Sequence, residues 1–327
     1  MNKRLLVRAT LIQTRFELLT VIKAEALEQM AATRRHAMSK RTNGCIAHMA
    51  DIEVDNLAVI EMGETRRNWR LCTRKEEDEV SDEIIARIQG VLTKNNLVPR
   101  NVHSCSQHKA QFLSQSVEIS GLRTATFGEA ISKISTVHDR FGEHLGGTTM
   151  LDIPSFDTGV GPVFSASNRL FTLKSDCPTE QDVEFHEGID TLGLLNRLKS
   201  GELIHAPENM VKFFKRVKHV DDGYEYAPFV PGGFKIGDIV ELQVTFVALA
   251  SRMNKVKLTS RLQAVTLLDN TFAKRAALAR KDANKYSRSK PAIRRKIGYF
   301  QDDIEDDRTN KKHKSTSLME NEDEMNQ

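Results

Sequence analysis

Apolar residues recur at three- and four-residue spacing along the first part of the chain. They are Leu5, Ala9, Ile12, Phe16, Leu19, Ile22, Ala26 and Met30. This spacing places them on one face of a helix, so residues 1–32 are predicted to form an amphipathic helix. The stripe is no more hydrophobic than an ordinary core face. That favours docking on a domain or a protein partner over lying at a membrane surface.

Residues 45–145 carry a mixed α/β pattern. The segment 45–62 alternates imperfectly and predicts one or two strands. Residues 81–92 predict a helix that Ser81 caps and whose first turn is acidic, as the helix dipole favours. A short strand, a break at Gly121 and a short helix follow. The stretch 138–162 is rich in Gly, Pro and Asp and predicts a long loop between two halves.

Residues 160–270 predict a mainly antiparallel β-domain that ends in a long hairpin. On the first hairpin strand, Val240, Leu242, Val244 and Phe246 point one way, and Glu241, Gln243 and Thr245 point the other. The second strand alternates in the same manner after a polar turn at 251–255. A hairpin with one apolar and one polar face is typical of a half-buried sheet or a small β-barrel.

After residue 270 the composition changes. Residues 271–299 are rich in Lys and Arg and predict a basic arm or helix. Residues 300–327 contain runs of acids and lysines with few large apolar residues, so a disordered charged tail is predicted. The predicted class is therefore α+β: a helical N-terminal part, a mainly antiparallel sheet or small barrel, and a disordered C-terminal tail.

The bulk composition sets broad limits. The chain has 327 residues, a net charge of only +4 and four widely spaced cysteines. The N-terminus carries arginines where a signal peptide is apolar, and no apolar run reaches the ~20 residues that cross a bilayer. We therefore expect an intracellular protein with free thiols and no membrane contact.

Two Cys-x-x-His pairs are the candidate metal ligands. Cys45 and His48 form one pair, and Cys105 and His108 form the other. Thiolate and imidazole are ligands that zinc prefers, but the separation between the pairs is far longer than in a compact zinc finger. Ordinary buried or surface residues are the favoured interpretation, and no metal or other cofactor is predicted.

A second cluster offers an enzymatic alternative. His138, Asp139, Glu143 and His144 precede Asp152 and Asp157, and paired carboxylates can hold Mg²⁺. This arrangement defines the alternative of a metal-dependent enzyme that uses the loop 138–157. No phosphate-binding glycine loop with its lysine, no Gly-x-Ser-x-Gly and no His-Glu-x-x-His is present, so a non-enzymatic protein is favoured.

Basic residues beside aromatic residues indicate nucleic acid as a partner, with single strands favoured. A cationic groove lined with aromatic rings is the chemistry that single strands need, and Phe213, Phe214, Tyr224 and Tyr226 are the candidate rings. The alternative is that the rings belong to the core and the lysines are solvated. The candidate contacts are Lys212, Lys215, Arg216, Lys257, Arg261, Lys274, Arg275, Arg294, Arg295 and Lys296. The clusters at 290–296 and 311–314 are also typical of a nuclear import signal or of a solvated tail.

Two resemblances add to this interpretation. The order Gly-Asp, strand, basic turn, strand in FKIGDIVELQVTFVALASRMNKVKLTSRLQAVTLL is similar to the closing strands of OB-fold single-strand-binding domains. With SDEIIARI, ISGLRTATFGEAI and ASNRLFTL, this hairpin resembles a family of uncharacterised proteins abundant in mushroom-forming fungi. The family resemblance spans about residues 69–299 and implies a fungal, multicopy origin without an assigned activity. The leading hypothesis is a nucleic-acid-associated or protein-binding module, and a structural protein that docks through its N-terminal helix is a further alternative.

Overall fold

The computed structural model describes most of the chain up to residue 287. The described ranges are 20–37, 46–63, 67–74, 81–98, 107–152, 156–157, 161–177, 179–186, 188–199, 201–218, 223–251 and 253–287. The chain divides into two compact units, Met1–Ala277 and Leu278–Gln327. Every described strand belongs to the first unit. Of the second unit, the structure describes residues 278–287, which are helical.

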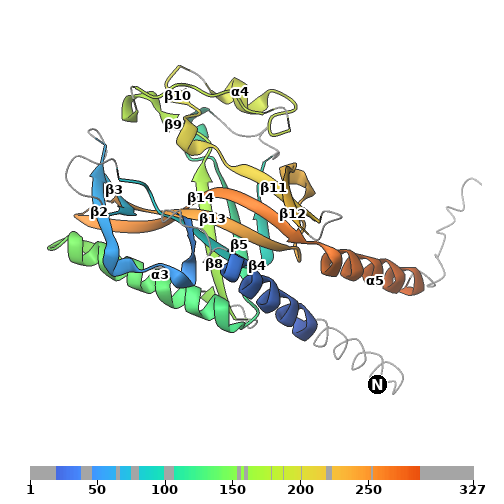
Figure 1. Cartoon of the computed structure of the whole chain (residues 1–327). Helices are drawn as coiled ribbons and strands as arrows, with labels where there is room; N and C mark the ends of the chain where they lie inside the picture. Colours follow the sequence, from blue (N-terminus) through green and yellow to red (C-terminus); the bar gives the residue numbers. More distant parts are fainter. Residues whose placement is uncertain are drawn as a thin grey trace, which may run out of the picture. The chain divides into compact units, whose positions relative to one another are not determined.

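The elements alternate between strands and a few helices (Figure 1). The strands are β1 (Ile46–His48), β2 (Leu57–Met62), β3 (Asn68–Thr73), β4 (Ile85–Asn96), β5 (Ser114–Ser120), β6 (Thr149–Leu151), β7 (Phe156–Asp157), β8 (Pro162–Arg169), β9 (Thr172–Leu173), β10 (Leu203–Ile204), β11 (Lys212–Lys218), β12 (Tyr224–Pro228), β13 (Ile239–Ala250) and β14 (Lys255–Asp269). The helices are residues 20–37, α2 (Gln107–Ala110), α3 (Ala125–His144), α4 (Leu194–Leu198) and α5 (Thr271–Ser287). Short 3₁₀ turns lie at Met49–Asp51, Val54–Asn56, Lys174–Asp176, Pro207–Asn209 and Pro231–Gly233.

Twelve of the described strands form one mixed sheet, so the α+β class is confirmed. Its main path runs β12-β11-β14-β8-β5-β4-β13-β3-β2, and β13 also pairs with β14. Strand β14 lies parallel to β6, β8 and β11, so the sheet is mixed, although most of its described pairings are antiparallel, as predicted. Strands β4 and β5, from before the predicted interdomain loop, pair with strands from after it.

Five strands form a hydrogen-bonded circuit in the order β4-β5-β8-β14-β13-β4. The link between β8 and β14 consists of a single registered pair, Ser167 with Arg261. The sheet is therefore not a closed barrel, and the predicted small barrel is not confirmed. Inside this curved sheet lie the apolar residues of β13, among them Val244 and Phe246, which are fully buried.

The closing hairpin has the predicted alternation but not the predicted exposure. Val240, Leu242, Val244 and Phe246 belong to the main core. On the opposite face, Glu241 and Thr245 are each only 1% exposed. The polar face is buried because other parts of the chain, including helix 20–37, cover it. A half-buried hairpin was therefore the wrong expectation for this region.

The predicted helix at 81–92 is a strand. Residues 85–96 form β4, which pairs with β5, β13 and, over its first residues, β1. The spacing of Ile84, Ile88 and Leu92 places them on one face of a helix, but it also places them on one face of a strand. All three are buried in the structure. Backbone pairing with neighbouring strands decides between these two structures, and that pairing is a long-range property.

Helix α3 is longer than predicted. Gly121 ends the preceding strand, and a Cβ there would lie 2.1 Å from the Phe127 ring, so this close approach requires glycine. Buried Phe127, Ile134, Val137 and Phe141 form the apolar stripe that packs α3 on the core. The helix continues to His144, so the predicted loop at 138–157 begins inside a helix.

Only parts of the segments predicted at the N-terminal and C-terminal ends fall within the described residues. Residues 20–37 are helical, so this helix runs past residue 32, where the predicted helix ends. Residues 1–19 lie outside the described residues. Residues 271–287 form α5, while residues 288–299 of the predicted basic arm and the predicted tail lie outside the described residues.

Helix 20–37 is held on the sheet by a buried ion pair. Glu241 of β13 accepts hydrogen bonds from Arg34 Nε at 2.8 Å and from Arg34 Nη2 at 2.6 Å. Burial opposes ionisation of Glu241, but the hydrogen bonds and charge of Arg34, together with Arg87, outweigh it and hold the pKa of this carboxyl below its ordinary value. Leu27 of the same helix packs on Val91 and Ile239.

We predict that Arg34→Met destabilises the protein by about 3 kcal/mol or more, because it leaves a buried carboxylate without its partner. Arg35→Met is the matched control: Arg35 binds Asp51 and Glu129 on the surface, so its loss should cost at most about 1 kcal/mol. Urea unfolding of both variants measures the two costs. Equal losses of unfolding free energy in the two variants would show that the ion pair of Arg34 does not stabilise the position of helix 20–37.

Candidate nucleic-acid interface

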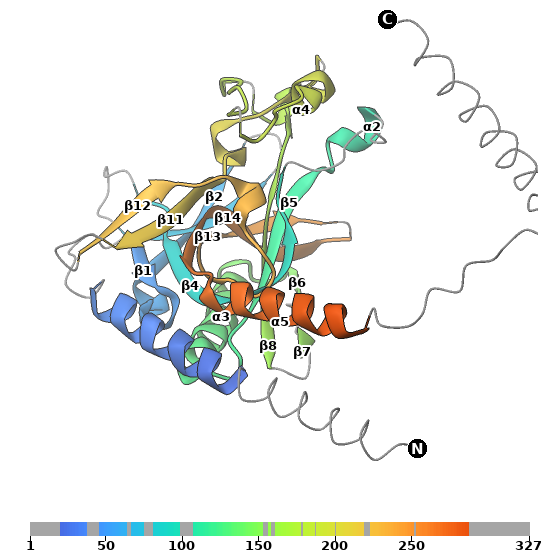
Figure 2. The same cartoon turned by 90° about the vertical axis from the view of Figure 1, so that its right-hand side faces the viewer.

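The β11–β12 hairpin presents aromatic and cationic side chains on one face. Arg216 lies directly opposite Tyr226, and Lys218 lies directly opposite Tyr224. Directly opposed residues of an antiparallel pair point to the same side of the sheet, so these four side chains share a face. Tyr224 is 52% exposed and Tyr226 is 36% exposed. Strand β12 is the end strand of the sheet, outside β11 (Figure 2).

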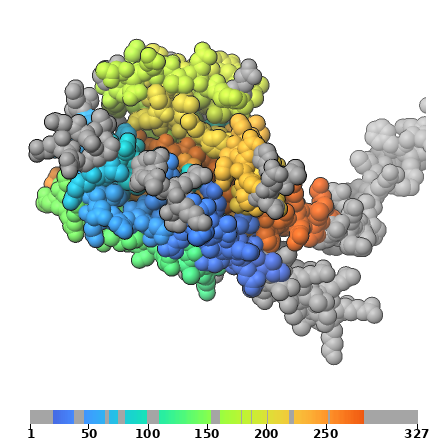
Figure 3. Space-filling view, viewed as in Figure 1, coloured from blue at the N-terminus to red at the C-terminus, as the bar shows by residue number. Residues whose placement is uncertain are grey.

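An arginine packs on each tyrosine ring. The guanidinium carbon of Arg216 lies 4.4 Å from the ring centroid of Tyr224, and that of Arg34 lies 5.2 Å from the ring centroid of Tyr226. Arg34 also donates a hydrogen bond to the Tyr226 hydroxyl. Arg216 approaches the sulfur of Met30 at 3.7 Å. Helix 20–37 therefore borders the hairpin, and Figure 3 shows their atoms side by side in blue and gold. We call this surface the tyrosine face.

The predicted contact residues are distributed over several surfaces. Lys212 shares the side of β11 with Arg216, whereas Lys215 alternates to the other side. Lys257 is exposed on β14, seven residues before Ala264, the residue that pairs with Lys212. That separation is about 23 Å along an extended strand, so Lys257 lies away from the tyrosine face.

The remaining candidates lie on or beyond α5. Lys274 and Arg275 are exposed in its first turns. Arg294, Arg295 and Lys296 lie outside the described residues.

Of the four predicted stacking rings, two are exposed. Phe213 is a core residue whose ring packs near Phe234, with centroids 6.1 Å apart. Phe214 is half-buried. Sequence reasoning missed Arg34, which reaches Tyr226 from 192 positions earlier in the chain. No local signal in the sequence could have found that contact.

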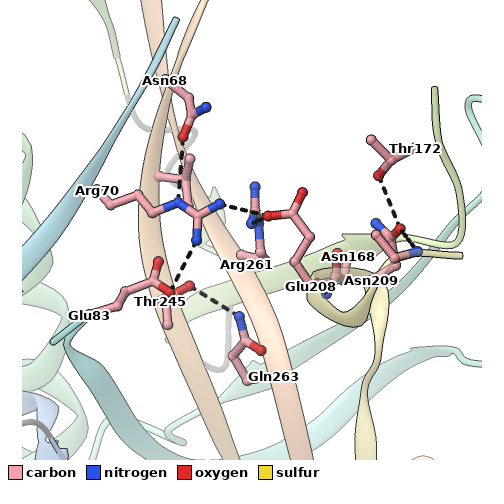
Figure 4. A network of polar contacts seen from close by, with 12 residues as sticks. Asn68, Arg70, Glu83, Asn168, Thr172, Glu208, Asn209, Thr245, Arg261 and Gln263 are labelled. Atoms are coloured by element: carbon pink, nitrogen blue, oxygen red, sulfur yellow. Dashed lines mark hydrogen bonds and ion pairs between the residues drawn. The ribbon is translucent and has the colours of Figure 1, made fainter. Parts of the chain in front are cut away.

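Arg261 is committed to an ion-pair network rather than to a free surface (Figure 4). Its Nη1 donates to Oε2 of Glu208 at 2.8 Å, and Arg70 Nη2 donates to the same oxygen at 2.6 Å. Arg70 also lies 3.5 Å from Glu83. Burial opposes ionisation of Glu208, but the charges of Arg261 and Arg70 outweigh it and hold the pKa of Glu208 below its ordinary value.

Glu208 also joins two parts of the first unit. It belongs to the Pro207–Asn209 turn, which follows the small β9–β10 sheet and α4. These elements have their own apolar cluster, which includes Phe171, Phe185 and Leu195. Asn168 of β8 donates to the Glu208 carbonyl at 2.8 Å and so fixes the turn from a second side.

The histidine of the first Cys-x-x-His pair is already fully hydrogen-bonded. His48 Nδ1 accepts from the Ala50 backbone N–H at 3.2 Å, and its Nε2 donates to Gln89 Oε1 at 2.8 Å. Gln89 Nε2 in turn donates to Glu241 at 2.6 Å. Both ring nitrogens are therefore occupied. Cys45, Cys105 and the side chain of His108 lie outside the described residues.

The residues of the enzymatic alternative do not converge in the part of the chain that the structure describes. His138, Asp139, Glu143 and His144 lie along α3. His138 Nε2 is 3.1 Å from the Leu151 carbonyl, and Glu143 pairs with Arg140. Within the described ranges, no three His, Cys, Asp or Glu side chains gather as metal ligands would.

No family model matches this chain, and no curated protein matches it. Within the described ranges, no helix has an apolar stretch long enough to cross a membrane.

We predict a coupling energy of about 1 kcal/mol between Arg261 and Glu208, measured by a double-mutant cycle of Arg261→Gln and Glu208→Gln in urea unfolding. The pair is half-buried, so its coupling energy should be larger than that of an open surface pair, for which about a few tenths of a kcal/mol are expected. The same cycle on Lys94 and Glu118, an exposed pair at 2.9 Å, is the control. Coupling no larger at Arg261 than at Lys94 would contradict the prediction.

A second prediction concerns pH. Burial lowers the pKa of His48, although Gln89 and nearby acidic charges oppose this. Below the ordinary histidine pKa of about 6.5, the unfolded chain therefore takes up the proton first. Stability should fall as the pH drops through this range toward the folded-state pKa, and level off below it.

Between about pH 7.5 and pH 5.5 the parent protein should thus lose more stability than His48→Gln, as urea unfolding at each pH will measure. His144→Gln on α3 is the control for the effect of a histidine-to-glutamine substitution itself. Identical pH profiles for the parent and His48→Gln would show that His48 does not titrate as inferred.

Proposed function

We propose that this protein is a nucleic-acid-associated module that binds single strands through the tyrosine face. The observation that carries the proposal is the pairing of Tyr224 and Tyr226 with Lys218 and Arg216 on one exposed side of the hairpin. Exposed rings provide stacking platforms for bases, and flanking cations neutralise phosphates.

The stacked arginines support this proposal in a second way. Arg216 lies over Tyr224, so ring and guanidinium form a layered planar surface. Bases stack on guanidinium planes as well as on rings. Arg34 has a different role, because Glu241 neutralises its charge. Arg34 therefore positions Tyr226 but adds little net charge to the tyrosine face. The free positive charge of the face therefore comes from β11, with Lys212 and Arg216 as the contacts.

The strand circuit also supports single strands as the ligand. Strands β4, β5, β8, β13 and β14 occur in this order along the chain, with other strands between β5 and β8 and between β8 and β13. Within the circuit only β8 and β14 pair in parallel. OB folds are five-stranded, partly open Greek-key barrels, many of which bind oligonucleotides. We propose that the circuit is an OB-like arrangement to which the β11–β12 hairpin is added.

Phosphate contacts make binding dependent on salt, because each contact releases counterions. Fluorescence anisotropy with a labelled single-stranded oligonucleotide across a salt series measures this dependence. Tyr224→Ala should weaken binding about tenfold by removing one stacking platform, whereas Tyr224→Phe should bind like the parent. Arg216→Gln should reduce the salt slope by about one.

Lys133→Gln on α3 removes the same charge from another element and is the control for Arg216→Gln. Binding that is insensitive to salt would contradict the phosphate contacts. Equal affinities for the parent and Tyr224→Ala would contradict the stacking platform. Stronger binding to duplex than to single strands would contradict the ligand class.

A further inference from the structure

A polar pocket of about 330 Å³ lies at the opposite end of the sheet from β12. Three separate segments form it: the ends of β2 and β3, the end of α3, and the turn between β13 and β14. They meet at the end of the sheet labelled β2 and β3 in Figure 1. The volume is at the lower end of the range for small-molecule sites, about 300–1,000 Å³, so it suits one compact ligand.

Lys255 gives this pocket its unpaired positive charge. It lines the pocket at the first position of β14 and makes no ion pair with any described residue. Asn254 beside it adopts φ of +53°, and its amide has no partner among the described residues. The turn is fixed by the Ser251 N–H, which donates to the Lys255 carbonyl at 2.7 Å. The turn therefore places two residues with donor side chains, Asn254 and Lys255, in the lining of the pocket.

Arg67 and Trp69 supply a planar wall. The Arg67 guanidinium lies over the Trp69 ring, 5.6 Å from its centroid, and donates to both oxygens of Glu61, one of them at 3.0 Å. Glu61 thus fixes the guanidinium plane and cancels its charge. The outer face of the guanidinium remains exposed, since the side chain is 67% exposed. A planar base can stack on it.

The charges set a limit on the ligand. Glu61 neutralises Arg67, and the C-terminal end of α3 contributes a partial negative charge that opposes Lys255. A polyanion such as a triphosphate therefore suits the pocket poorly. Among the described residues that line the pocket, one unpaired lysine lies beside one planar wall, and a ligand with one phosphate and one planar ring matches this arrangement.

We propose that this pocket binds a mononucleotide, with the base against Arg67 and the phosphate at Lys255. The ligand is either a free nucleoside monophosphate or one nucleotide of a strand, since both offer this chemistry. The proposal is independent of the tyrosine face, which involves other residues at the other end of the sheet.

Trp69 is the single tryptophan of the chain, so its fluorescence reports on this pocket alone. The experiment titrates the full chain with adenosine monophosphate, with adenosine, with inorganic phosphate and with a short single-stranded oligonucleotide. Equilibrium dialysis measures the same affinities independently of fluorescence. Adenosine monophosphate should change the Trp69 emission saturably, and adenosine and phosphate should each bind more weakly.

Lys255→Gln should raise the Kd for adenosine monophosphate about tenfold through loss of one charge-assisted contact. Lys257→Gln is the matched control, because this lysine lies on the same strand but does not line the pocket. Tyr224→Ala should leave the affinity for the mononucleotide unchanged. A stronger response to the oligonucleotide than to the monophosphate would identify a strand as the source of the nucleotide.

Four results would overturn the proposal. The first is no binding of adenosine monophosphate by dialysis. The second is an equal loss of affinity in Lys255→Gln and Lys257→Gln. The third is inorganic phosphate that binds as tightly as the nucleotide, which would exclude recognition of the base. Loss of mononucleotide binding in Tyr224→Ala would instead assign the binding to the tyrosine face and overturn the pocket.

Discussion

The buried carboxylate of Glu241 is the constraint on which much of the first unit depends. A charge in the interior is tolerated only with a partner and full hydrogen bonding. That partner is Arg34, 207 positions away in the chain, so helix 20–37 must lie over β13. Gln89 and His48 complete the hydrogen-bond chain and fix β4 and β1 around the same group. Packing of Leu27 and its neighbours then stabilises a position that the ion pair specifies.

The same ion pair links the interior to the surface. Arg34 binds Glu241 on one side and contacts the Tyr226 ring on the other. The orientation of the candidate interface thus rests on a group in the interior, Glu241, which is buried. Glu208 has a comparable effect on Arg70 and Arg261, whose charges it compensates where β3, β14 and the Pro207–Asn209 turn meet. Positive residues therefore divide into those that hold the fold together and those that remain available to a ligand, such as Lys212 and Lys255.

Some elements of the fold were predicted correctly from the sequence, and others were not. It predicted the closing hairpin with its alternation, the break at Gly121 and a helix after it. It predicted a helix where β4 lies, because Ile84, Ile88 and Leu92 satisfy a helical stripe and a buried strand alike. It placed Arg261 in the nucleic-acid surface, because Glu208 lies 53 positions away and cannot be paired with it from the sequence. For the site, it identified the tyrosines and lysines of the hairpin but not Arg34.

The sequence by itself determined which side chains share a face, because the period of a strand or helix is a local property of the backbone. It thus separated Val244 from Thr245. Only the tertiary structure decided which faces are covered, since burial depends on contacts between segments distant in the chain. That is why Glu241 is an interior ion-pair partner and not a surface acid. It is also why Trp69, Arg67 and Lys255, drawn from two distant segments, line one pocket.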